Sequence, residues 1–233
     1  MNYERQRDIV NQSLISRYPV SLIGCGAIGS AVAMALAKMG VNYFTLYDED
    51  GVNEVNLSNQ MYRIGDLGDF KVDALGGIIK GYNPDAVINA INKDYYGQPL
   101  TQIVIVATDS MRSRQKVWEQ FCVQSQCGYY IEARMGAEEG QIYTFRKVTK
   151  SDTALVLIPY ISEEDKAFYW ERLYSDIEAV PLPCTGKAVI YNVFMIASLV
   201  CRAFKATIHN EPFPREVVFG MKQIHKYSFQ IRD

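Results

Sequence analysis

The chain has 233 residues, of which 48% are hydrophobic and 21% are charged, and its formal net charge is −2. This much apolar material can bury a full core without disulfides or a structural metal, so we expect one large domain. A nearly balanced charge argues against binding of duplex nucleic acid, which normally takes a basic domain or stripe.

The apolar runs indicate neither a membrane span nor a secretion signal. The longest run, residues 189–200, carries polar side chains and falls short of the ~20 residues that cross a bilayer. The first eight residues are charged and lack the apolar core of a signal peptide. We therefore expect a cytoplasmic protein with no membrane partner. The five cysteines contain no C-x-x-C pair, which argues against a disulfide framework or a four-thiolate zinc site.

Hydrophobic periodicity predicts strands that alternate with helices in the first half of the chain and a less regular second half. The expected strands are 18–23, 41–47, 87–91, 103–107, 129–133, 141–145, 217–219 and 227–229, and the expected helices are 8–17, 30–39, 71–80, 111–125, 163–174 and 185–205. This order predicts an α/β fold, a Rossmann-like doubly wound sheet that is mostly parallel, with late antiparallel strands.

A glycine-rich turn, residues 24–29, joins the first buried strand to the next helix and has the form G-x-G-x-x-G. Gly24 would allow the tight turn, Gly26 would let a phosphate approach the backbone, and Gly29 would allow close packing of helix and strand. The start of the helix offers unpaired N–H groups and a partial positive charge to an anion. The turn therefore predicts a nucleotide site.

The residue that ends the next strand, Asp48, lies where a carboxylate can bind ribose hydroxyls. An NAD-dependent dehydrogenase would have the same turn and the same acid. In such enzymes an ordinary helix follows, whereas here residues 48–60 form a polar loop rich in carboxylates and amides. A loop of this kind can cover the sugar and phosphates of a nucleotide.

Four motifs in order resemble those of the ThiF/MoeB/HesA family, the adenylyltransferases similar to ubiquitin-activating enzyme. After the glycine-rich turn come D-E-D-G-V at 48–52, N-L-S-N-Q at 56–60, a lysine that opens a helix, Lys71, and T-D-S at 108–110. The similarity covers about residues 3–205. It implies a single ThiF-type adenylation domain over 1–233, with a nucleotide-binding half at about 18–130 and a crossover segment and C-terminal part at about 146–233.

The resemblance implies ATP-dependent adenylation of the C-terminal carboxylate of a small, Gly-terminated ubiquitin-like or sulfur-carrier protein or peptide, with Mg²⁺ and in a homodimer. Lys71 would bind phosphates and Asp109 would hold Mg²⁺. Arg5 would act on the phosphates, in the family at the neighbouring subunit's site, and Cys184 would form a thioester or acyl disulfide or be a buried thiol. The nucleotide-binding residues would be Gly24, Gly26, Ala27, Gly29, Asp48, Asp50, Asn56, Asn59, Gln60 and Lys71.

One departure from the family pattern leaves an alternative open. The arginine of N-L-x-R-Q is Asn59 here, which removes a cation expected near the phosphates unless Arg63 replaces it. A catalytically weak binding subunit of a heterodimeric activating enzyme is therefore the third hypothesis. An NAD-dependent oxidoreductase, based on the glycine-rich turn and Asp48, is the second.

Overall fold

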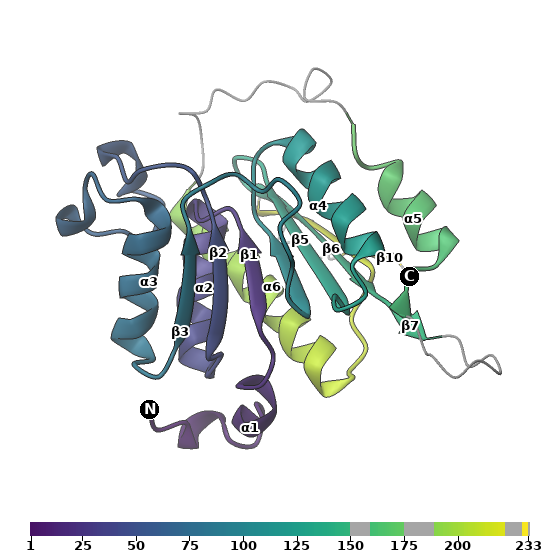
Figure 1. The fold of residues 1–233 in the computed structure, drawn as a ribbon, viewed down its shortest axis with the longest axis horizontal. Coiled ribbons are helices and arrows are strands. Elements are labelled where there is room, and N and C mark those ends of the chain that lie inside the picture. Colours follow the sequence, from purple (N-terminus) through teal and green to yellow (C-terminus); the bar gives the residue numbers. More distant parts are fainter. Residues whose placement is uncertain (150–158, 175–188, 222–229, 233) are drawn as a thin grey trace.

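The computed structural model describes residues 1–149, 159–174, 189–221 and 230–232. In these residues the main sheet has eight strands in the order β10-β9-β6-β5-β4-β1-β2-β3 (Figure 1). Its strands are β1 (Val20–Ile23), β2 (Tyr43–Tyr47), β3 (Val87–Ile91), β4 (Ile103–Val106), β5 (Tyr129–Met135), β6 (Glu139–Arg146), β9 (Glu216–Gly220) and β10 (Gln230–Arg232). A separate pair consists of β7 (Val148–Thr149) and β8 (Pro159–Tyr160).

The strands from β3 to β5 across the sheet are parallel, and those from β6 to β10 continue it in antiparallel pairs. The hairpin from β5 to β6 reverses the chain direction within the sheet. The prediction of a mostly parallel, Rossmann-like sheet with late antiparallel strands is confirmed.

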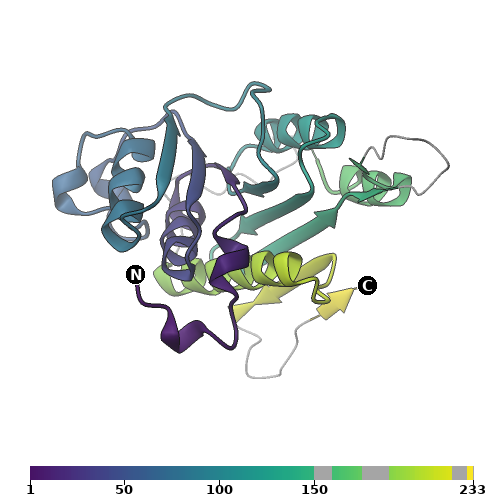
Figure 2. The same ribbon diagram turned by 60° about the horizontal axis from the view of Figure 1, so that its bottom comes forward.

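Helices cover both faces of the sheet, as the two ribbon views show (Figures 1 and 2). They are α1 (Gln12–Ile15), α2 (Ala27–Met39), α3 (Lys71–Tyr82), α4 (Met111–Val123), α5 (Glu163–Trp170) and α6 (Ile190–His209), and the 3-10 turns are η1 (Glu4–Gln6), η2 (Glu54–Asn56) and η3 (Ile64–Asp66). One apolar core lies under α2, α3 and α6, and a second, rich in aromatic rings, lies under α4 and α5. Both cores depend on strands whose side chains are buried on two faces, as parallel strands usually are.

Helix α6 is long and apolar enough to cross a membrane by length and composition, with a mean hydropathy of 1.2 over its best window. Half of that window is buried inside the fold, where residues such as Val193, Ile196 and Val200 join the core beside α2. In this structure α6 therefore serves as a core helix.

Several element boundaries differ from the predicted ones for local reasons. The bounds expected for the first helix, 8–17, are wrong. The Asn11 side chain accepts a hydrogen bond from the Leu14 amide, and α1 starts only after this cap. Helix α2 begins at Ala27, directly after the glycine-rich turn, and not at residue 30. The strand expected at 227–229 and residues 185–188 of the last helix fall outside the described residues, and the last described strand, β10, lies at 230–232.

The central strands end side by side. Ile23 pairs with Tyr47 on one side and with Val106 on the other, so the segments that follow β1, β2 and β4 emerge at the same edge of the sheet. In open α/β sheets this edge is where ligands bind.

Candidate nucleotide site

Two of the three motif glycines are required by the packing of the turn itself. Gly24 has a φ of +90°, and a Cβ there would lie 2.7 Å from the Ala107 carbonyl carbon. A Cβ on Gly29 would lie 1.9 Å from the Gly24 carbonyl oxygen. Any larger residue at either position would push the backbone of the turn apart.

The third glycine leaves open space at the start of α2. A Cβ on Gly26 would meet no atom within 4 Å. The amide N–H groups of Ala27 and Ile28, in the first helical turn, have no acceptor among the described residues. Open surface and unpaired amides at a helix N-terminus are the features that an anion can bind.

Asp48 holds the backbone around this turn. Its Oδ2 accepts a hydrogen bond of 2.7 Å from the Cys25 amide, and its Oδ1 accepts one of 2.9 Å from the Asp50 amide. Burial raises the pKa of the Asp48 carboxyl, and the nearby Lys71 ammonium and these two amides oppose that rise. The carboxylate therefore links β1 to the loop after β2, a role that the sequence had not suggested.

Lys71, the first residue of α3, is buried beside this carboxylate. Its Nζ lies 2.7 Å from Asp50 Oδ2 and 4.0 Å from Asp48 Oδ1. The lysine side chain is 9% exposed, whereas that of Asp50 is 64% exposed. The backbone reinforces the contact, because the Lys71 amide donates to the Asp50 carbonyl. Sequence motifs 21 residues apart are thus brought together at the turn.

Tyr62 is a site residue that the sequence analysis missed. Its buried hydroxyl lies 2.6 Å from the Cys25 carbonyl oxygen and 3.3 Å from the Lys71 carbonyl oxygen. The Ser30 hydroxyl similarly accepts a hydrogen bond from the Met61 amide. These contacts fasten the segment directly after the polar loop to the glycine-rich turn and to the first turn of α2. A tyrosine in a polar loop carries no distinctive sequence signal, so only the fold identifies it.

The side chains and backbone of the polar loop form hydrogen bonds within the loop. Asn56 Oδ1 accepts a hydrogen bond from the Asn53 amide, and the Asn56 carbonyl accepts from the Gln60 amide. Gln60 Oε1 is buried without a hydrogen-bond partner among the described residues. The backbone N–H of Asn59 donates a hydrogen bond to the same Asn56 carbonyl.

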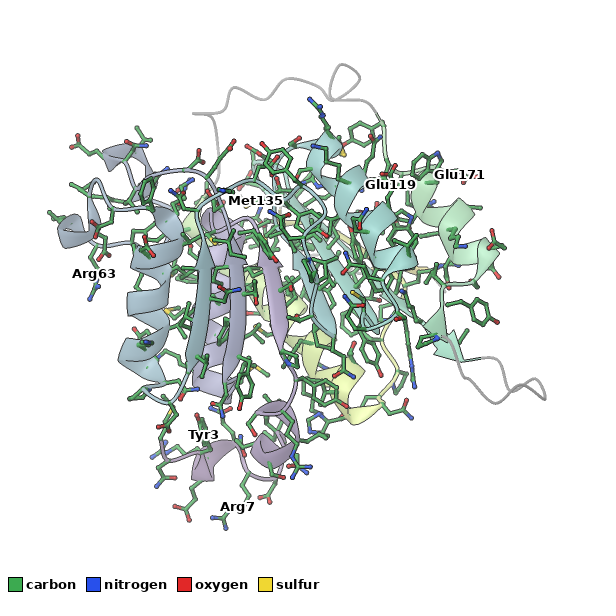
Figure 3. All side chains as sticks on the ribbon, in the orientation of Figure 1. Tyr3, Arg7, Arg63, Glu119, Met135 and Glu171 are labelled. Carbon is green, nitrogen blue, oxygen red and sulfur yellow. The ribbon has the colours of Figure 1, made fainter. Side chains whose placement is uncertain are left out.

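Arg63 does not take the place of the missing family arginine in this structure. Its guanidinium binds Asp66, with Nη2 3.0 Å from Oδ1 and Nε 3.2 Å from Oδ2, and its side chain is 70% exposed. Figure 3 shows Arg63 at the outer side of the molecule, pointing away from the sheet.

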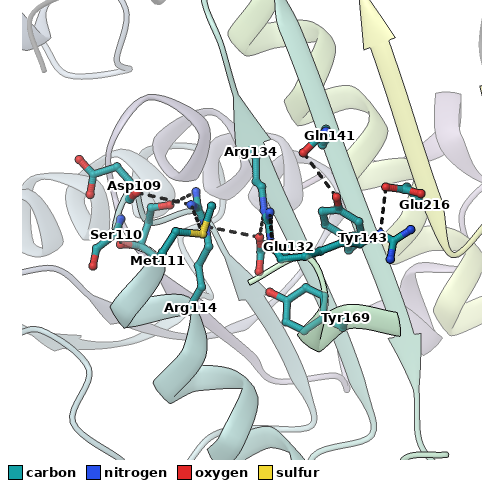
Figure 4. Close-up of polar contacts among 12 residues, drawn as sticks. Asp109, Ser110, Met111, Arg114, Glu132, Arg134, Gln141, Tyr143, Tyr169 and Glu216 are labelled. Atoms are coloured by element: carbon teal, nitrogen blue, oxygen red, sulfur yellow. Dashed lines mark hydrogen bonds and ion pairs between the residues drawn. The ribbon is translucent and has the colours of Figure 1, made fainter. Parts of the chain in front are cut away.

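Asp109 follows β4 at the same edge of the sheet as the glycine-rich turn. Its side chain is exposed, and no described residue donates a hydrogen bond to its carboxylate. Its backbone is held instead, because Arg114 Nη1 lies 3.4 Å from the Asp109 carbonyl oxygen and Arg114 Nη2 also binds the Thr108 carbonyl (Figure 4). The buried Arg114 was not among the predicted site residues.

Arg5 lies at the opposite end of α2. Tyr3 packs on Gly40 and the Gln6 side chain donates to the Lys38 carbonyl, both at the C-terminus of that helix. Figure 3 shows Tyr3 and Arg7 at one end of the molecule and Met135, at the carboxyl end of β5, near the other. Within one chain Arg5 is therefore not part of this site. Cys184 lies outside the described residues.

The residues fit a magnesium ion that arrives with phosphates. In the described part of the chain no three His, Cys, Asp or Glu side chains form a metal-binding group. Mg²⁺ usually takes one or two carboxylates together with phosphate oxygens and water, and Asp109 offers one exposed carboxylate at the nucleotide edge.

Two curated relatives match parts of the chain. Ubiquitin-like modifier-activating enzyme 5 of Oryza sativa subsp. japonica is 33% identical over 89 residues, which cover 38% of this chain and 19% of that protein. A probable molybdopterin-synthase adenylyltransferase of Gracilaria tenuistipitata var. liui is 28% identical over 141 residues, which cover 58% of this chain and 39% of that protein. The matches therefore span less than half the length of either relative.

A solved structure shares the fold. The structure of E. coli MccB with AMPCPP and MccA superposes with a TM-score of 0.71 at 18% identity, covering 95% of this chain and 64% of that chain. The ThiF family model matches residues 3–200, nearly the whole extent of the resemblance seen in the motifs. With the sheet order, the glycine-rich turn and the motif residues gathered at one edge, the match shows that this chain belongs to the ThiF family.

Proposed function

We propose that this protein is an ATP-dependent adenylyltransferase that activates a carboxylate. One observation carries the proposal: the unpaired amides of Ala27 and Ile28 and the open surface over Gly26 lie at the same strand edge as the buried ammonium of Lys71. A neutral or singly charged ligand would not need a helix N-terminus and a desolvated lysine together. A triphosphate, with several negative charges, can use both.

Lys71 has a partner that it can exchange for a phosphate. Its ion pair with Asp50 is close, but the Asp50 carboxylate is mostly exposed and stays hydrated when the lysine turns away. Asp48 is nearly buried and remains bonded to the turn, so it keeps the lysine near the site. The two carboxylates therefore hold the Lys71 ammonium beside the turn until an anion binds.

In the proposed reaction a carboxylate oxygen forms a bond to the α-phosphorus, the bond from that phosphorus to the bridging oxygen of pyrophosphate breaks, and pyrophosphate leaves with both electrons. The amides at the start of α2 and Lys71 would neutralise the negative charge that develops on the phosphates. A bound Mg²⁺ would supply further charge neutralisation there, with Asp109 as its protein ligand.

The proposed acyl substrate is the C-terminal glycine of a ubiquitin-like or sulfur-carrier protein, or of a peptide. Support comes from the names of the relatives, one of which activates a ubiquitin-like modifier, and from MccB, whose structure contains MccA. We also propose a homodimer in the cytoplasm. The chain spans well under two thirds of its curated relatives, so these assignments rest on similarity to part of each.

A pyrophosphate-exchange assay tests the proposal. The protein would be incubated with ATP, Mg²⁺, labelled pyrophosphate and a panel of Gly-terminated carriers and peptides. We expect label to enter ATP with at least one of them, and exchange by Lys71→Met to be about 100-fold slower or more. Failure of every carrier to support exchange by a protein that binds ATP would contradict the proposed activity.

Asn59 supports a second candidate function: a weakly catalytic binding subunit of a heterodimeric activating enzyme. The motif lacks its arginine, and Arg63 is engaged by Asp66. On this hypothesis the protein binds ATP without exchange, and Asn59→Arg raises exchange well above that of the unmodified protein. If Asn59→Arg leaves exchange unchanged in a protein that is already active, the first candidate stands.

A further inference from the structure

A buried ionic network lies beneath the Thr108–Asp109 turn, outside the motif residues described so far (Figure 4). It is centred on Glu132 of β5, whose side chain is 0% exposed. Its Oε1 forms ion pairs with two guanidinium groups: Arg114 Nε lies 3.3 Å away without the geometry of a hydrogen bond, and Arg134 Nε donates a hydrogen bond to it. Its Oε2 accepts a hydrogen bond of 3.0 Å from the Tyr130 hydroxyl. The carboxylate is therefore fully paired.

The network is anchored well away from the turn. Arg134 Nη1 donates to the Arg172 carbonyl, 2.8 Å away, just after α5, and its guanidinium lies over the rings of Tyr143 and Tyr169. Glu132 pairs with Val106, the last residue of β4, so the anchor sits beside the point where the Thr108–Asp109 turn leaves the sheet.

Arg114 connects this anchor to both peptide units that flank the Asp109 Cα. One bond goes to the Thr108 carbonyl and a second, longer one of 3.4 Å goes to the Asp109 carbonyl. Fixing the peptide planes on both sides of a residue fixes its φ and ψ, and with them the direction of its Cα–Cβ bond. No described side chain holds the Asp109 carboxylate, so this backbone clamp, which fixes the point from which the side chain projects, is the constraint that the described residues place on it.

We infer that Arg114, braced by Glu132 and Arg134, is a positioning residue that holds the Asp109 carboxylate in place for a divalent cation brought by the nucleotide phosphates. The inference rests on the proposed function for the identity of the ligand. Glu132 is paired with both arginines, and Arg114 reaches the Asp109 turn only through the two backbone carbonyls. Polar groups behind a metal ligand of this kind commonly change metal affinity about 10–100-fold when they are removed.

The test measures cation binding directly and does not depend on turnover. Mn²⁺ would be titrated into the protein in the presence of ATP and followed by electron paramagnetic resonance, and ATP would be titrated separately in EDTA. For Arg114→Met we expect the apparent Kd for Mn²⁺ to rise about tenfold or more, with the Kd for ATP in EDTA changed less than about twofold. Arg114→Lys, which keeps the charge but loses the fork, should lie between Arg114→Met and the unmodified protein.

Two further variants complete the comparison. Asp109→Asn gives the effect of losing the ligand itself, and Lys116→Met removes a cation from the same helix α4 without touching the turn. We expect Lys116→Met to bind Mn²⁺ as the unmodified protein does. If Arg114→Met does not fold, Arg114→Lys and Glu132→Gln carry the measurement, and each should weaken Mn²⁺ binding selectively.

Equal losses of Mn²⁺ and metal-free ATP binding in the Arg114 variants, or unchanged Mn²⁺ binding, would overturn the inference and leave Arg114 a structural residue. The proposed function fails in a different way. A protein that binds Mn²⁺ and ATP with the expected Arg114 effect, but shows no pyrophosphate exchange with any carrier, would support the clamp and contradict adenylation.

Discussion

Two glycines in the same turn have opposite tolerances for a methyl group. Gly29→Ala would place its Cβ 1.9 Å from the Gly24 carbonyl oxygen, whereas Gly26→Ala would meet no protein atom within 4 Å. We expect Gly29→Ala to lower the free energy of unfolding by about 3 kcal/mol or more through overpacking. Gly26→Ala should cost about 1 kcal/mol as a poorer N-cap.

The two variants should separate folding from binding. Gly26→Ala fills the space in which an anion would approach the amides, so it should fold and yet bind ATP about tenfold more weakly or worse. Urea unfolding and ATP titration on the same samples check this. A Gly26→Ala protein that binds ATP normally would exclude the open surface over Gly26 as the phosphate site.

Lys71 is the residue at which charge matters most. Lys71→Met keeps the length of the side chain and removes the ammonium, so we expect the exchange rate to fall ~100-fold or more. Lys80→Met, a lysine further along the same helix, is the matched control and should keep its activity. The rates of pyrophosphate exchange at saturating ATP provide the comparison, and equal rates for the two variants would remove Lys71 from the phosphate site.

Among individual residues, the sequence predicted the site residues whose chemistry is distinctive and missed those that act through contacts with the backbone. The three glycines, Asp48 and Lys71 lie at one edge as expected. The Asp48 contacts with two amides were not predicted, since a carboxylate after a strand looks the same whether it binds ribose or backbone. Glu132 was missed because a single acid inside an apolar strand does not reveal its partners, which lie on α4 and two residues along β5.

The segment between η2 and α3 depends on a short ionic cap. Asp66 Oδ2 accepts a hydrogen bond of 2.7 Å from the Arg63 amide, and the Arg63 guanidinium holds the pKa of the Asp66 carboxyl below its usual value. A carboxyl with a lowered pKa in the folded state stabilises the protein above its unfolded pKa of about 3.9. That contribution is lost as the pH falls through the folded value.

We therefore expect Asp66→Asn to lower the free energy of unfolding by about 0.5–1 kcal/mol at pH 7, a modest figure because the Arg63 side chain is mostly exposed. The difference from the unmodified protein should shrink below about pH 4. Urea titrations from pH 7 to pH 3 measure it, with the exposed Asp69→Asn in the same segment as the control. A difference that stays constant down to pH 3 would show that the charge of Asp66 plays no part.

Elements were predicted best where the hydrophobic pattern and a stop signal agree. Strand β3 occupies the residues expected, and α2 ends at Met39 before Gly40, whose φ is +101°. The start of α2 was placed too late because the glycine-rich turn was treated as a loop before the helix. In the structure Gly26 is already the N-cap, which is why the first helical amides face the proposed phosphate site.

Within one chain, Arg5 and the glycine-rich turn lie at opposite ends of α2. The 13 residues of this helix give a separation of about 20 Å. If Arg5 acts on phosphates, it must do so in another copy of the chain. We expect Arg5→Ala and Lys71→Met each to be inactive alone and, when mixed and allowed to exchange subunits, to recover about a quarter of the exchange activity. No recovery in a mixture shown to contain heterodimers would contradict a shared site.

The sequence predicts the class of sheet but not the complete order of its strands. Alternating strands and helices favoured a parallel, doubly wound sheet, and the right-handed crossovers it needs limit the arrangements. The antiparallel extension from β6 to β10 follows from long-range pairing of β6 with β9, for which no local turn signal exists. How the edge of the sheet becomes a site depends on that arrangement, since β1, β2 and β4 meet only in three dimensions.

We propose that the glycine-rich turn binds ATP and not a dinucleotide. Calorimetric titration of the full chain with ATP and Mg²⁺, and separately with NAD, tests it most directly, with Gly26→Ala as the control for the site. We expect ATP to bind to the unmodified protein, Gly26→Ala to weaken this binding while the fold persists, and NAD to give no comparable heat. Tight binding of NAD without binding of ATP would contradict it and make the protein an oxidoreductase candidate.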